Sequence, residues 1–306
     1  MAQIRKFIEG NFSLLLLLGV IIGFFVPKFG SFADELVIVL TAVLIFLSCA
    51  DIKPVDFFKI DVFQVGIFVV LRFAVFPLIL FFLAYKLAPE YAVGVLLLSL
   101  MPAGVAVASL CSMSHAKVVL GLGLTIISSL LAPAIIPAAF SFLGKFVEVD
   151  IFDLFLVLTG VVFLPVGLYF GLLNRSEKIS GAIRKYNKAG SVLILSFILV
   201  IVIAAQKEAL LNDVSTIVYG LIVMTIFFVV VYGFGFIYAM FMPKEDRVAY
   251  ILSSGAMNNS LAVGLAFAYF DATTSLFIVL SEIVWSVCVA LAQWYFSKRA
   301  KLEIAN

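Results

Sequence analysis

The 306-residue chain is 65% hydrophobic and only 12% charged, whereas a soluble domain is about 45–50% apolar. A membrane-spanning helix needs about 20 apolar residues, so the chain has room for about ten spans with short loops and for no soluble enzyme domain. The 20 basic and 18 acidic residues nearly balance, which gives no indication of nucleic-acid binding. We therefore expect an all-α, polytopic membrane protein that acts within the lipid bilayer.

Proline, glycine and charged clusters divide the sequence into ten apolar segments. Their approximate ranges are 8–27, 35–50, 62–86, 90–113, 116–143, 150–173, 189–206, 214–242, 247–270 and 273–297. Ten spans separate into five in residues 1–145 and five in residues 146–306, and an odd number of crossings turns the second set upside down. Two inverted five-helix repeats are typical of secondary transporters.

The basic residues are distributed unevenly between the two sides of this topology. With the N-terminus inside, fifteen of the twenty lysines and arginines fall on the inner side, and Lys28, Lys86, Lys145 and Lys207 fall on the outer side. Cytoplasmic loops carry an excess of lysine and arginine. We therefore expect both termini in the cytoplasm and the protein in the inner (plasma) membrane.

Two charged residues fall within spans, Arg72 in the third and Glu282 in the tenth. A charge at the bilayer centre costs at least about 2.5–3.5 kcal/mol on insertion scales, so such residues usually face a cavity or a partner. Arg72 and Glu282 are either a structural ion pair or part of a substrate or coupling site. The two interpretations are compatible, because a pair that lines a cavity can open when substrate arrives.

The fourth and ninth spans carry breaks at corresponding places in the two halves. The fourth contains Pro102–Gly104, where proline removes a donor and glycine tolerates unwound backbone, and the ninth contains the polar run Ser253–Ser260. Unwound backbone at this depth must be buried or line a watery cavity, so we expect the breaks to cross and form the site. Half-helices that start near Val105 and Asn259 would point their positive ends at an anionic ligand. The predicted substrate-binding residues are Ala103, Gly104, Val105, Asn258, Asn259 and Ser260.

Several short motifs occur in a specific order along the chain. They are Asp51–Phe57, Arg72–Pro77, Ala92–Val95 before the break at Pro102–Gly104, Pro133, and Met257–Ser260. Together they resemble the bile acid:sodium symporter family of ten-helix carriers. The resemblance implies a core domain (spans 3–5 and 8–10) that moves against a panel domain (spans 1, 2, 6 and 7), and transport of organic anions with two sodium ions.

The family's first sodium site is largely replaced in this sequence. Its serine and asparagine correspond to Val107 and Ala108, and a further serine corresponds to Gly121. The glutamate shared by both sites corresponds to Ser254, and Thr125 alone keeps its residue type. An acid and several side-chain oxygens are therefore missing.

At the second site the family glutamine of the third span corresponds to Arg72, and the remaining degenerate positions are Met257 and Asn258. Arginine stays protonated in proteins and cannot ligate a cation. We therefore expect no metal site and no cofactor, with sodium not used. Arg72 would supply a fixed charge in its place, with Glu282 as counter-ion or proton carrier and Ser254 and Thr125 beside them.

The sequence thus predicts a secondary transporter of small organic anions, bile acid-like or carboxylate-type, that works by alternating access without sodium. One alternative is a sodium-coupled symporter that uses backbone carbonyls with Asn258 and Thr125. A second is a membrane sensor or scaffold on a transporter fold. We do not expect an enzyme, because the one histidine, His115, falls in a loop and no metal-binding cluster occurs at membrane depth.

Overall fold

The computed structural model of the protein describes residues 11–30, 32–50, 61–104, 106–144, 149–173, 176–212 and 214–305, with positions 3, 5, 7 and 8. This part of the chain is built from helices, and its one β-type contact is an isolated bridge. Six of its helices are long and apolar enough to cross a membrane, and four shorter apolar helices occupy other predicted spans. The protein is therefore a multi-pass membrane protein, as the composition predicted.

The helices follow the predicted apolar segments in order. Those of the first half are α2 (Phe12–Phe25), α3 (Ala33–Cys49), α4 (Val62–Val70), the π-helix η2 (Leu71–Val75), α5 (Phe76–Leu87), the short η3 (Pro89–Tyr91), α6 (Ala92–Leu100), α7 (Ala106–Met113) and α8 (Val118–Phe142). Those of the second half are α9 (Ile151–Leu168), η4 (Tyr169–Leu173), α10 (Glu177–Asn212), α11 (Val214–Met240), α12 (Arg247–Gly255), α13 (Asn259–Tyr269) and α14 (Ala272–Ala305).

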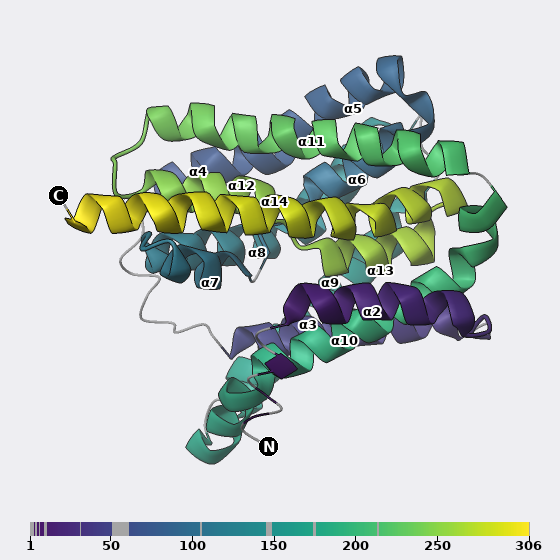
Figure 1. Ribbon diagram of the computed structural model, residues 1–306, viewed down its shortest axis with the longest axis horizontal. Coiled ribbons are helices and arrows are strands. Elements are labelled where there is room, and N and C mark those ends of the chain that lie inside the picture. The colour runs from purple at the N-terminus through teal and green to yellow at the C-terminus, as the bar shows by residue number, and fades with distance from the viewer. Residues whose placement is uncertain are drawn as a thin grey trace.

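Two helices are longer than their predicted spans. α10 begins at Glu177 rather than near residue 189, and α14 continues to Ala305 rather than ending near residue 297. The charged first turns of α10 extend beyond the neighbouring helices (Figure 1). The predicted bounds came from hydropathy, which falls at charged residues, whereas lysine, arginine and glutamate are good helix formers and let the backbone helix continue.

The helices form two packed groups. α2 packs against α10, and α3 packs against both α9 and α10; we call these four helices the first group. The second group contains α4, η2, α5, α6, α7, α8, α11, α12, α13 and α14, in which α5 packs on α6 and α11 packs on α12 and α14. The groups meet where α3 contacts α13, α9 contacts α8, and α10 contacts α14 and α11. In Figure 1, α2, α3 and α10 lie together, apart from α4, α11 and α12.

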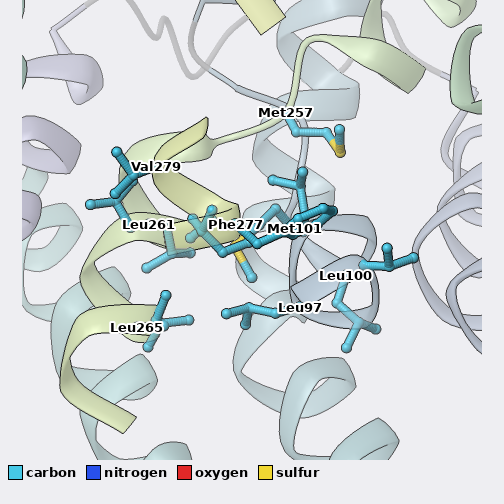
Figure 2. Close-up of a cluster of buried hydrophobic side chains, with 14 of the residues drawn as sticks. Leu97, Leu100, Met101, Met257, Leu261, Leu265, Phe277 and Val279 are labelled. Carbon is cyan, nitrogen blue, oxygen red and sulfur yellow. The ribbon is translucent and has the colours of Figure 1, made fainter. Parts of the chain in front are cut away.

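Buried apolar side chains join the broken helices to α14. Figure 2 shows this cluster, with labelled residues from α6, α13, α14 and the segments between the half-helices: Leu97, Leu100, Met101, Met257, Leu261, Leu265, Phe277 and Val279. A Cβ on Gly94 would lie 2.5 Å from a ring carbon of Phe277, so glycine at this position lets α6 and α14 approach closely. The two interrupted helices and α14 therefore share one core.

Candidate functional site

The two predicted breaks meet and bond to one another. α6 ends at Leu100 and α12 ends at Gly255, and α7 and α13 begin a few residues later. The N–H of Gly104 donates to the carbonyl of Ala256 (2.7 Å), and the N–H of Asn258 donates to the carbonyl of Pro102 (2.8 Å). Backbone groups that have left their helices are thus satisfied by the opposite break, as a position inside a membrane requires. The structure thus contains both predicted breaks and places them against each other.

Gly104 allows this close approach. A Cβ at this position would lie 2.7 Å from the carbonyl oxygen of Met257, inside van der Waals contact with backbone atoms. Ser128 of α8 supports the same segment, because its Oγ accepts the N–H of Ala103 (3.0 Å). Val105, the next predicted site residue, lies outside the described residues.

Arg72 connects the ends of the two half-helices that precede the crossing. Its side chain is fully buried. Nη1 donates to the carbonyl of Ser99 (2.9 Å), and Nε and Nη2 donate to the carbonyl of Ser254 (3.1 and 2.7 Å). Ser99 and Ser254 are the last residues but one of α6 and α12. A single guanidinium therefore caps both helices.

This arrangement is electrostatically favourable. The C-terminal end of a helix carries a partial negative charge of about half an electron, and the guanidinium offers a fork of donors that cannot deprotonate. The guanidinium carbon also lies 4.8 Å from the ring centroid of Phe73. The predicted site included only the positive ends of the later half-helices, although each break also creates a negative helix end.

A local widening of the helix positions Arg72. Residues Leu71–Val75 form a π-helical turn, in which the N–H of Phe76 donates to the carbonyl of Leu71. Pro77 follows directly and has no N–H to donate to the preceding turn. A π-bulge is a common feature of functional sites in helices.

Glu282 has no comparable partners among the residues that the structure describes. It lies on α14 with 3% of its surface exposed, and both carboxylate oxygens are buried without a hydrogen-bond partner. The donors of Arg72 are directed at Ser99 and Ser254 instead. The two buried charges therefore do not form the ion pair that was one interpretation of the sequence.

The polar residues of the ninth span point in different directions. The Asn258 side chain caps α13, since its Oδ1 accepts the N–H of Leu261 (3.2 Å). Asn259 turns toward α14, where its Nδ2 donates to Oγ of Ser281 (3.2 Å), and its own Oδ1 is buried without a partner. Asn258 thus faces the crossing, and Asn259 faces α14.

The positions that correspond to the family's first sodium site are filled by other atoms. A Cβ on Gly121 would lie 2.7 Å from Sγ of Cys111 and 3.1 Å from a methyl carbon of Val107. The Thr125 hydroxyl lies 3.0 Å and 3.2 Å from the carbonyls of Gly121 and Gly104. Ala108 adds no oxygen, and the Ser254 hydroxyl donates to the carbonyl of Tyr250 (3.0 Å). Hard cations require several oxygen ligands, and these side chains do not fit that requirement.

A cavity of about 170 Å³ lies beside the crossing. One side is formed by α3, α9 and η4, and the other side is formed by α8 of the second group together with the crossing. Its lining residues are Ile45, Cys49, Pro102, Leu122, Thr125, Ile126, Ser129, Leu130, Val162, Val166, Phe170, Asn258 and Leu261. Three of these side chains are polar, and none is charged. The lining combines a large apolar surface with a few hydroxyl and amide groups, which is typical of a small-molecule site.

Of the predicted substrate-binding residues that the structure describes, Asn258 lines this cavity. Ala103 and Gly104 are buried within the crossing, and Asn259 and Ser260 are absent from the lining. The wall formed by Cys49, Val166 and Phe170 was not predicted. In the sequence these residues look like any other apolar side chain of a span, so no local pattern distinguishes them.

Broken helices that meet beside a cavity in a multi-pass helical protein are typical of secondary transporters. The sequence profile of the Sodium Bile acid symporter family matches residues 33–213. The chain belongs to this family. It is also 24% identical, over 318 aligned positions that include 99% of this chain and 96% of the relative, to a Bacillus subtilis (strain 168) protein described as an uncharacterized sodium-dependent transporter, YocS.

Proposed function

We propose that the protein is a secondary transporter of small organic anions, bile acid-like or carboxylate-type, which works by alternating access without sodium. The observation that carries this proposal is the buried Arg72 guanidinium, bonded to the ends of both α6 and α12. A permanent cation already occupies the place where two helix dipoles favour positive charge. Sodium at the same place would be repelled in a medium that screens charge weakly.

The cavity beside the crossing is the proposed substrate site. Asn258, Thr125 and Ser129 supply hydrogen-bonding groups without negative charge, and the N-terminal end of α13 starts at its wall. This end favours the anionic group of a substrate, and the apolar side of the cavity suits a hydrophobic body.

Alternating access would move the first group of helices against the second. The cavity supports this proposal because its walls come from both groups, with Ile45 and Val162 on one side and Thr125 and Asn258 on the other. In this proposal the first group is the panel domain and the second group is the core domain. The same proposal includes two inverted repeats, residues 1–145 and 146–306. It also places both termini in the cytoplasm and the protein in the inner membrane. Ion pairs support the topology, since Lys28–Glu208 and Lys117–Asp246 each join residues of one predicted side.

A second candidate is a sodium-coupled symporter. The name of the Bacillus subtilis relative favours it. In this candidate the ligands would be backbone carbonyls with Asn258 and Thr125, and transport would require sodium strictly.

Uptake into proteoliposomes tests the proposal. Labelled taurocholate and pyruvate serve as an amphipathic and a small anion, in sodium medium and in choline medium. We expect uptake of at least one anion at equal rates in both media. Ser129→Trp should block uptake by filling the cavity, whereas Phe163→Trp, on the exposed face of α9, should not. Uptake only in sodium would favour the second candidate, and no flux of either anion would contradict transport of this class of substrate.

A further inference from the structure

Glu282 is a buried charged group within a span that the proposed transport site does not use. Within the described part of the chain, neither of its oxygens has a hydrogen-bond partner, and the side chain is almost completely buried on α14. An ionised carboxylate without donors is very costly in an apolar medium, because nothing replaces its hydration. An acid at this depth in a membrane protein is a candidate for a proton relay.

The ionisable groups on the helices around α14 do not neutralise this carboxylate. α14 packs against η3, α6, α7, α10, α11, α12 and α13. The described acids and bases of these helices lie near helix ends or on the charged extension of α10: Glu90, Glu177, Lys178, Arg184, Lys185, Lys188, Lys207, Glu208 and Arg247. Their other ionisable side chains are phenols and a thiol: Tyr91, Cys111, Tyr186, Tyr219, Tyr232, Tyr238, Tyr250 and Tyr269. Arg72, bonded to α6 and α12, is engaged by carbonyls.

A short chain of contacts connects Glu282 to the cavity. Its neighbour Ser281 accepts a hydrogen bond from Asn259, the first residue of α13. The preceding residue, Asn258, lines the cavity and bonds the opposite break through Pro102. The buried cluster around Leu261 and Val279 packs the same parts of α13 and α14 together (Figure 2). A change of charge at Glu282 therefore occurs beside the residues that position the start of α13.

We propose that Glu282 is the proton-binding site that couples this transporter to a proton gradient. The carboxylate takes a proton from water on one side of the membrane, which forms one O–H bond and removes one negative charge, and returns the proton to water on the other side. The neutral acid also gains a donor that the carboxylate lacks, and Asn259 Oδ1 is a buried acceptor without a partner on the adjacent helix. The inference rests on the proposed transport function, of which it names the coupling ion.

Infrared difference spectroscopy of the protein in proteoliposomes tests proton binding without any substrate. The carbonyl stretch of a neutral carboxylic acid is separate from that of a carboxylate, and a pH titration in sodium-free choline medium follows both. We expect a neutral-acid band that titrates in the wild type and in Glu282→Asp and is lost in Glu282→Gln. Glu90→Gln, an exposed acid on η3, is the matched control and should keep the band.

Taurocholate uptake under an imposed pH gradient tests coupling, with protein-free liposomes as the blank. One proton carried per monoanion gives about tenfold accumulation for each pH unit. We expect this accumulation in the wild type and in Glu90→Gln, and its loss in Glu282→Gln, which should still exchange taurocholate across the membrane at equal pH.

The outcomes separate the two proposals. A spectrum that is the same with and without Glu282 at every pH overturns the inference, as does a Glu282 band that never titrates. Loss of the band on adding sodium at constant pH also overturns it, because a metal cation would then be the ligand. A titrating band without taurocholate transport supports proton binding and contradicts the proposed substrate. Sodium-free uptake that does not depend on the pH gradient supports the proposed transport function and overturns proton coupling through Glu282.

Discussion

The two charged residues within the predicted spans, Arg72 and Glu282, have opposite surroundings. Arg72 donates hydrogen bonds to the ends of two helices and lies over an aromatic ring. The two carboxylate oxygens of Glu282 are buried and have no hydrogen-bond partner among the described residues. A permanent cation held by fixed carbonyls is a part of the framework. A buried acid without partners favours its neutral form, because nothing replaces the hydration of the carboxylate, and it ionises when water reaches it.

This difference assigns a structural role to Arg72 and a role in ion coupling to Glu282. The crossing of the broken helices carries its own positive charge and needs no bound ion to assemble, so Arg72 should affect folding strongly. Glu282 should affect folding weakly and ion coupling strongly. Substitutions at the crossing should therefore lower the free energy of unfolding more than a substitution at Glu282.

Arg72→Leu should lower the free energy of unfolding most. It orphans the buried carbonyls of Ser99 and Ser254, and each such acceptor costs about 1–3 kcal/mol. Arg72→Lys keeps the charge, but its ammonium group lacks the planar set of donors that reaches the carbonyls of both helices. The stability of this variant should therefore lie between those of the wild type and Arg72→Leu. Arg72→Gln should also reduce anion transport. Unfolding in detergent measures stability, and an Arg72→Leu protein as stable as the wild type would contradict a framework role.

Gly104→Ala should separate the two breaks. The new Cβ would lie 2.7 Å from the carbonyl oxygen of Met257, and overpacking of this kind costs about 1–3 kcal/mol. Gly66→Ala is the matched control, because nothing lies within 4 Å of the added carbon on α4, and alanine is a better helix former. The two unfolding midpoints should therefore move in opposite directions, and a shared direction would argue against close contact at the crossing.

Asn258→Ala should have a smaller effect, since it removes the N-cap of α13. Loss of a cap costs about 1 kcal/mol. Asn258→Asp keeps an acceptor for the N–H of Leu261 and should retain most of the stability, while its negative charge in the cavity wall should lower anion uptake. Equal uptake by Asn258→Asp and the wild type would place the anion elsewhere.

Glu282→Gln should change stability least. The amide removes a charge that has no partner in the structure, so the unfolding midpoint should stay the same or rise. A loss of stability as large as that of Arg72→Leu would show that Glu282 is a structural ion, and the contrast between the two charges would fail.

The sequence predicted the parts of this site that depend on local chemistry. Pro102 and Asn258 indicated where the helices break, since proline and a run of polar residues cannot continue a lipid-facing helix. The depth of Arg72 and Glu282 followed from counting residues along the spans. These features are properties of one segment at a time.

The remaining features depend on contacts between distant segments. The bonds from Arg72 to Ser99 and Ser254 join residues that are 27 and 182 positions apart, and both acceptors are backbone carbonyls, which every residue has. The cavity wall at Cys49 and Phe170 likewise depends on how α3 and η4 pack beside the crossing. Hydropathy places these residues in spans but cannot assign them to a cavity.

Replacing sodium by choline during anion uptake tests the central claim most directly. The claim is that the Arg72 guanidinium supplies the charge at the crossing, so the transporter needs no sodium. Initial rates of taurocholate or pyruvate uptake into proteoliposomes should be the same in the two media at a fixed pH gradient. A strict requirement for sodium, with uptake in choline no higher than in protein-free liposomes, would contradict it.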